Sequence, residues 1–339
     1  RDEQACGVIL FRRNIVSLEQ VVALNGELST LSQPDHPVVI GVDQEGGRVA
    51  RLAGICTDVG PMRSVGHLSE TDPRLPFSVG AMMGRELAAL GFHLNFAPVV
   101  DVDSNPNNPV IADRSFSALP HVVARCGADF IRGLQKSGVA ACAKHFPGHG
   151  DTDTDSHLMM PVLHVDKSRL DRVELIPFAA AIEAGVASIM TAHVMFPALD
   201  DEHPATLSRC ILHDVVRKQL GFGGVVFSDD LQMKAIADRY AISETIALGL
   251  RAGVDVFLIC NDVALTAEAI ACAERLCAAD STLREALVAA RRRIGALRSK
   301  YVGQPDAPRL DEARAMVRCA PHVRLGARVA AMAVAADAH

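Results

Sequence analysis

The chain has 339 residues, enough for one large domain or two smaller ones. Its 34 Lys and Arg against 40 Asp and Glu give a net charge of −6, the wrong sign for a protein whose main partner is nucleic acid or an anionic membrane. Hydrophobic residues make up 49% and exclude a disordered chain, while an aromatic share of 4% without Trp argues against broad stacking platforms for nucleic acid or long glycans.

Short, nearly all-apolar runs alternate with amphipathic segments along the chain, which is typical of parallel strands covered on both faces by helices. The predicted strands are residues 7–11, 38–43, 93–102, 139–146, 187–194, 224–230 and 254–260. The predicted helices include residues 17–31, 77–90, 121–136, 167–184 and 207–220, with Gly91, Gly138 and Gly185 as left-handed caps. We expect residues 1–278 to form one domain and residues 279–339, helical and cationic at their start, to pack on it as a helical extension.

Alternation of this kind allows a doubly wound sheet or a (β/α)₈ barrel. A doubly wound sheet would gather its polar residues near one switch point and usually carry a Gly-rich phosphate turn, and no such turn is present. Polar residues instead follow nearly every predicted strand: Asp43, Asp101, Lys144 with His145, His193, Asp229 and Asn261. We therefore predict a TIM-type barrel with seven evident strands, whose eighth strand is either degenerate or precedes Arg1.

The segment KHFPGHGDTDTDSH, residues 144–157, is the most unusual in the chain. It leaves an apolar strand and enters a Gly- and Pro-rich loop with three His and three Asp, too many ionisable groups for an ordinary surface loop. These residue types also bind metals, but no H-E-x-x-H or H-x-H pattern supports such a site. We expect chemistry here without a metal or cofactor.

Three further segments supply charged residues to the same end of the predicted barrel, where the carboxyl ends of the strands meet. GFGGVVFSDDLQM delivers two successive Asp, of which we expect Asp230 to cap the next helix and Asp229 to be free as a nucleophile or charge stabiliser. VDQEGGRVAR places Asp43 at a strand end with Arg48 and Arg51 behind it, and ADRSFS contributes Arg114.

The scattered placement of nine Cys, without any C-x-x-C, is typical of a reduced intracellular protein. No stretch reaches the roughly 18 apolar residues of a membrane span, and no signal-peptide pattern opens the sequence. We expect a cytoplasmic protein, and we note that the sequence begins with Arg1 rather than Met.

Five of these segments, KHFPGHGDTDTDSH, FSDDLQM, VDQEGGRVAR, NFAPVVDV and MTAHV, resemble the cytoplasmic bacterial β-N-acetylglucosaminidases of glycoside hydrolase family 3. The resemblance runs from GVILFRRN near the start to about VFLICND, with the motifs in the order of that family. It implies a barrel that removes terminal N-acetylglucosamine (GlcNAc) from peptidoglycan fragments during cell-wall recycling. It further implies retaining hydrolysis, with Asp229 as the nucleophile, His157 as the acid/base and Asp155 orienting His157. The positions matching those that bind the sugar are Asp43, Arg51, Arg114, Lys144 and His145.

Other interpretations stay open at this level. A glycoside phosphorylase with the same Asp and His is the alternative, because a His acid/base tolerates an incoming phosphate dianion that a carboxylate would repel. A non-catalytic sugar sensor would be favoured by loss of Asp229 or His157, and both are present. The expected partner is a small muropeptide or GlcNAc glycoside, with no nucleic acid and no membrane, and the chain is expected to be a monomer.

Overall fold

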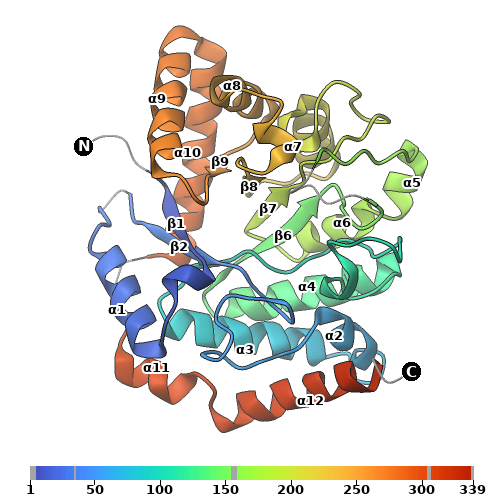
Figure 1. Cartoon of the computed structure of the whole chain (residues 1–339), viewed down its shortest axis with the longest axis vertical. Helices are drawn as coiled ribbons and strands as arrows, with labels where there is room; N and C mark the ends of the chain where they lie inside the picture. Colours follow the sequence, from blue (N-terminus) through green and yellow to red (C-terminus); the bar gives the residue numbers. More distant parts are fainter. Residues whose placement is uncertain (1–4, 34–35, 154–158, 304–306, 337–339) are drawn as a thin grey trace.

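The computed structural model describes residues 5–33, 36–153, 159–303 and 307–336 (Figure 1). Within them seven parallel strands form one curled sheet in the order of the chain. Each lies within a predicted strand, although only two residues of the predicted strand 93–102 form one. The strands are β1 (Gly7–Leu10), β2 (Val39–Val42), β5 (Leu94–Asn95), β6 (Ala140–Phe146), β7 (Ser188–Thr191), β8 (Val225–Asp230) and β9 (Val256–Leu258). This half-barrel is consistent with the TIM-type barrel expected from the sequence, and an eighth strand stays a prediction.

Helices surround the sheet. They are α1 (Leu18–Ser29), α2 (Met62–Leu68), α3 (Leu75–Ala89), α4 (Pro120–Lys136), α5 (Lys167–Arg172), α6 (Leu175–Glu183), α7 (Lys234–Ala237), α8 (Ile242–Ala252), α9 (Val263–Ala279), α10 (Ser281–Tyr301), α11 (Leu310–Met316) and α12 (Ala320–Ala336), with short 3-10 turns η1 (Arg12–Asn14), η2 (Ala112–Arg114) and η3 (Ala205–Leu207). Helices α11 and α12 pack mainly on other helices. Gly91, Gly138 and Gly185 have φ of 85°, 87° and 76°, which confirms the predicted left-handed caps.

Two predicted helices differ from the structure. The segment 167–184 is not one helix but two, α5 and α6, because Pro177 lacks an N–H and its ring would clash with the carbonyl of Val173 in a continuous helix. The break puts Glu174 at the start of α6. The segment 207–220 forms η3 and then a wider π-helix, η4 (Cys210–Gln219).

A small hairpin after β2 was not predicted. Its strands, β3 (Gln44–Gly46) and β4 (Val49–Ala50), pair antiparallel, and Gly46 and Gly47 at the turn have φ of 106° and 53°. Both β3 residues before the turn are buried, and the Asn95 side chain fixes Gln44 through two hydrogen bonds to its backbone. The hairpin therefore holds Glu45 and Arg51 rigidly beside the end of β2.

The end of the barrel away from the polar strand ends is closed by α10. Leu297, Tyr301 and Val302 pack in one apolar cluster with inner-face residues of several strands, including Phe96 and Phe227, whose rings meet edge to face at 5.3 Å. Below the sheet in Figure 1, α12 runs across α2 and α3. Residues of α10, α11 and α12 lie in the same apolar clusters as residues of the strands. The domain boundary that we expected near residue 279 remains a prediction.

Candidate active site

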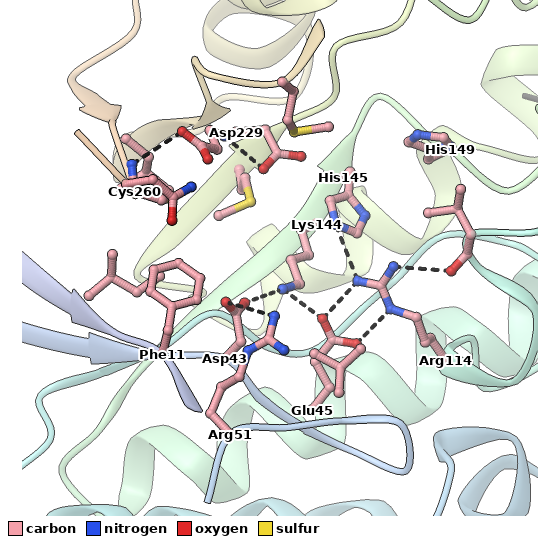
Figure 2. Close-up of a pocket in the computed structure, with 18 of the residues that line it drawn as sticks. Phe11, Asp43, Glu45, Arg51, Arg114, Lys144, His145, His149, Asp229 and Cys260 are labelled. Atoms are coloured by element: carbon pink, nitrogen blue, oxygen red, sulfur yellow. Dashed lines mark hydrogen bonds and ion pairs between the residues drawn. The ribbon is translucent and has the colours of Figure 1, made fainter. Parts of the chain in front are cut away.

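A cavity of about 390 Å³ opens at the carboxyl ends of the strands. β1, β2, the hairpin, β6, β8 and β9 or the residues just after them supply its walls, as barrel strands do at a functional mouth. Figure 2 shows most of the lining side chains pointing into this space. Predicted site residues among them are Asp43, Arg51, Arg114, Lys144, His145 and Asp229.

The floor of the cavity is a network of buried charges. Lys144 Nζ lies 2.8 Å from Asp43 Oδ1 and 2.7 Å from Glu45 Oε1. Arg114 donates to both Glu45 oxygens at 2.8 Å, a bidentate pair (Figure 2). Two cations thus share one carboxylate, and the three side chains fix one another's positions.

The network keeps its members charged in spite of burial. Burial alone would raise the pKa of Glu45, but Arg114 and Lys144 hold the pKa of this carboxyl well below its usual range. Burial would likewise lower the pKa of Lys144, and Asp43 and Glu45 raise it instead. The floor is therefore ionic across the neutral pH range, with directional donors and acceptors suited to sugar hydroxyls.

His145 is oriented by Asp101 at the end of the neighbouring strand region. Its Nδ1 donates to Asp101 Oδ2 at 2.8 Å, and its backbone N–H also reaches that carboxylate. Burial would raise the pKa of Asp101, but His145 lowers it overall. The ring's Nε2 is left facing Arg114 Nη2 at 3.5 Å and the cavity.

Arg51 is the least compensated of the predicted sugar-binding residues. Its Nη2 lies 4.0 Å from Asp43 Oδ2, beyond hydrogen-bond distance, and its Nε has no hydrogen-bond partner among the described residues. Asp43 Oδ2 and the Arg51 guanidinium therefore present an acceptor and donors side by side to a ligand in the cavity.

The two successive Asp of β8 have opposite electrostatic environments. Burial would raise the pKa of Asp229, but His193, then His145 and the Asp230 N–H, hold it below its ordinary value. The pKa of Asp230 is raised, mainly by burial. Neighbouring carboxyls tuned apart in this way are typical of sites that need one ionised carboxylate.

Asp230 does not cap a helix as predicted. Its Oδ1 accepts from the backbone N–H groups of Gln232 and Cys260, which ties β8 to the residue after β9. α7 begins four residues later, with no side-chain cap. The S-D-D pattern could not distinguish a turn of this kind from a helix cap, because an Asp side chain serves either.

Two further His lie buried around the site. His193 Nε2 donates to the Asp230 carbonyl at 3.1 Å, and its Nδ1 lies 2.7 Å from Thr206 Oγ1. His149 lines the cavity, and its Nδ1 lies 2.8 Å from Thr152 Oγ1 in the same loop. Burial, and then His145, lowers the pKa of His149 to about 4, so this ring is uncharged at neutral pH.

The remaining predicted residues are not all in the cavity or in the described chain. Asp155 and His157 lie outside the described residues. Arg48 does not line the cavity; it pairs with Asp113 at 3.1 Å and donates to the carbonyls of residues 110 and 111.

Sequence reasoning missed the part that two residues play in building the candidate site. Glu45 lies in the VDQEGGRVAR segment, directly before two glycines. An acidic residue before a Gly-Gly turn was the only sign of its part in the site, because Glu45 becomes buried only when the hairpin forms. Asp101 was recognised as a strand-end residue but not as the partner of His145, since 44 residues separate them.

Within the described ranges no three His, Cys, Asp or Glu are grouped so that they could hold a metal ion. None of the helices in those ranges has the length and apolarity to cross a membrane.

Comparison with known proteins agrees with this geometry. Residues 1–295 match the model of the glycosyl hydrolase family 3 N-terminal domain. The β-hexosaminidase of Thiobacillus denitrificans is 42% identical over 269 residues, covering 78% of this chain and 74% of that protein.

Solved structures match over nearly the whole chain. A family 3 β-N-acetylglucosaminidase from Paenibacillus is 37% identical with a TM-score of 0.88, and the match covers 95% of this chain but 62% of that one. NagZ from Neisseria gonorrhoeae is 33% identical with a TM-score of 0.77, covering 96% and 90%. That protein has also been solved with N-trifluoroacetyl-D-glucosamine. The chain belongs to glycoside hydrolase family 3 and is an enzyme of its β-hexosaminidase type.

Proposed function

We propose that this protein is a retaining exo-β-N-acetylglucosaminidase that removes terminal GlcNAc from muropeptides in peptidoglycan recycling. The observation that carries the proposal is Asp229: an acid whose pKa is held down by His193 and His145, at the end of β8, facing a small ionic cavity. A cavity of about 390 Å³ is at the small end of ligand pockets, which suits one terminal ring better than a long glycan.

The proposed reaction has two steps. The Asp229 carboxylate attacks the anomeric carbon while His157 gives its proton to the departing oxygen, so that the glycosidic C–O bond breaks as the glycosyl–Asp229 bond forms. His157, oriented by Asp155, then takes a proton from water, whose oxygen attacks the anomeric carbon and displaces the Asp229 carboxylate. Each step inverts the anomeric carbon, so the two together retain its configuration.

The other site residues would hold the sugar. Asp43 and Arg51 offer an acceptor and donors for adjacent hydroxyls, while Lys144, Arg114 and Glu45 form a floor that does not need to rearrange. His145, fixed by Asp101, completes the ring of polar contacts.

We place the enzyme in the cytoplasm, as a monomer acting without a metal or cofactor. The location is supported by nine free cysteines, five of them buried, with no disulfide among them.

The nucleophile is tested with Asp229→Ala and an aryl β-N-acetylglucosaminide. GlcNAc release should fall below about 1% of the unsubstituted rate, and added azide should restore aryl release while forming the glycosyl azide of inverted configuration. Retained hydrolysis without azide would contradict the assignment.

His157→Ala tests the acid/base. It should slow substrates with poor leaving groups most, since an activated aryl group needs less protonation. Equal losses on both kinds of substrate would argue against a general acid. Product analysis with and without phosphate separates the enzyme from a phosphorylase, because accumulation of GlcNAc 1-phosphate would overturn hydrolysis.

A further inference from the structure

The residues after β1 form a second wall of the cavity that none of the assigned roles uses. Phe11 and Arg13 line the cavity together with Asp43 and Asp229. Phe11 is half-buried, and Figure 2 shows it across the cavity from His145 and His149. Its ring lies 5.7 Å from the Arg51 guanidinium and 4.6 Å from that of Arg13, so Phe11 stands next to both cations.

Arg13 is held in place by the far end of the sheet. Its Nη2 donates to the Cys260 carbonyl at 2.5 Å, which joins the segment after β1 to the segment after β9. This bond and the contact with Phe11 orient the guanidinium at the rim, while its other N–H groups are not engaged by any described residue.

The charge of Arg13 is not balanced by the described residues. The other lining cations have carboxylates: Lys144 has two, Arg114 has Glu45, and Arg51 has Asp43 at 4.0 Å. Arg13 forms no ion pair with a described carboxylate, although it is exposed and could pair freely with one.

The depth of these groups decides which part of a substrate each would meet. The sugar-binding floor is buried, with Lys144 3% and Glu45 2% exposed. A terminal ring that fills this floor must direct its leaving group toward the open side of the cavity, where Arg13 is exposed. Arg13 and Phe11 therefore lie where the aglycone passes.

We propose that Arg13, with Phe11 as its support, forms a subsite for an aglycone that carries a carboxylate. The guanidinium would pair with the carboxylate, and the Phe11 ring would pack against the apolar part beside it. The inference rests on the proposed function and adds the charge of the group beyond the scissile bond. A muropeptide, which has free carboxyl groups, falls in this class.

The test uses two glycosides of nearly equal shape, 4-carboxyphenyl and 4-carbamoylphenyl β-N-acetylglucosaminide, that differ in charge. The measured quantity is the ratio of their kcat/KM values, carboxyl over carbamoyl, so that general losses of activity cancel. Arg13→Gln should lower this ratio about threefold relative to the unsubstituted chain, because the guanidinium is exposed, and Arg13→Lys should keep most of it. The ratio of the unsubstituted chain should also fall as NaCl is raised from about 20 to about 500 mM.

Arg12→Gln is the matched control. Arg12 is also exposed and also donates to a carbonyl, that of Ile15, but it does not line the cavity. Its ratio should equal that of the unsubstituted chain.

The outcomes separate this inference from the proposed function. An active Arg13→Gln variant with an unchanged ratio would overturn the subsite alone, as would an equal fall in Arg12→Gln. If Arg13→Gln disturbs folding, a ratio of the unsubstituted chain that does not respond to salt overturns it. Failure of the unsubstituted chain to release GlcNAc from either glycoside would refute the proposed function and the subsite with it.

Discussion

Glu45 and Glu174 are almost equally buried, 2% and 3% exposed, yet their carboxyls behave in opposite ways. Glu45 receives three close contacts from two cations, and its pKa is held well below the usual range. Glu174 lies under the loop that leaves β6: a Cβ on Gly148 would come within 2.9 Å of its Cγ. Arg169 is its ion-pair partner, with Nη2 3.1 Å from Oε1, and Arg169 is shared with Asp151 at 3.5 Å.

Burial dominates at Glu174 and raises its pKa to about 7, even though Arg169 opposes the shift. The comparison teaches that compensation by cations, more than depth, decides whether a buried carboxyl in this fold is ionised. It also separates two parts of the site: the floor of the cavity, where Glu45 stays ionised, and the contact under the 147–153 loop, where the charge of Glu174 depends on pH.

The largest effect is expected from Glu45→Gln. The change removes the carboxylate that Lys144 and Arg114 share and leaves two buried cations with one fewer counter-charge. We expect a loss of about 3–5 kcal/mol in the free energy of unfolding, together with a strong fall in kcat/KM. Urea unfolding at pH 7 measures the first quantity, and a loss below about 1 kcal/mol would contradict the network's role.

A smaller, pH-dependent effect is expected from Glu174→Gln. The native pKa of about 7 lies above the ordinary value of 4.5, so the native state holds a proton that the unfolded state releases between these values. The contribution of Glu174 to stability should therefore fall as pH rises from about 4.5 to about 7, with no further fall above. His149, whose pKa is lowered to about 4, contributes in the opposite sense over nearly the same range, so the effect of Glu174 is read from the difference between the variant and the unsubstituted chain.

Glu174→Gln should remove that loss and be more stable at pH 8 by the order of 1–3 kcal/mol, but not at pH 4. Unfolding free energies measured across this range check it. Asp171→Asn is the control, because this neighbouring carboxylate on α5 is exposed and paired with Lys167. Its profile should run parallel to that of the unsubstituted chain above pH 5. If the free energy of unfolding changed with pH in the same way for the Glu174→Gln variant and the unsubstituted chain, the pKa of Glu174 would not be raised, and Glu174 would not differ from Glu45 in its charge.

The smallest effect is expected from Asp113→Asn at the rim. Asp113 and Arg48 form an ion pair with both side chains nearly half exposed. Water already solvates the charges, so we expect a change of about 0.5 kcal/mol or less in unfolding free energy and unchanged kcat/KM. A loss as large as that of Glu45→Gln would mean that burial does not make the ion pairs of Glu45 stronger than the exposed pair of Arg48 and Asp113.

Much of the architecture was predictable because it is local. Most of the seven strands are short, nearly all-apolar runs that alternate with longer amphipathic segments. The helices α1, α3 and α4 have caps and periodicity that a short window contains. The break between α5 and α6 follows from Pro177, a local signal that the amphipathic pattern of the whole segment concealed.

The site was predictable only in part. Asp43, Arg51, Arg114, Lys144, His145 and Asp229 do line one cavity, while their roles remain proposals, and Asp155 and His157 lie outside the described residues. These residues were predicted from the likeness of their motifs to those of glycoside hydrolase family 3, and composition alone would not have identified them. Glu45 and Asp101 escaped because their importance depends on partners that are distant along the chain, 69 residues away for Glu45 and Arg114 and 44 for Asp101 and His145.

The sequence by itself determined the alternation of strands and helices, the polar residues at the strand ends and the family, since each is written in short stretches of residue types. Only the tertiary structure decided which charges are shared: that Glu45 serves both Lys144 and Arg114, that Arg13 has no described carboxylate and that Glu174 has one cation shared with Asp151. The physical reason is that Coulombic energy depends on distance and local solvation, and neither is set until the strands are brought side by side.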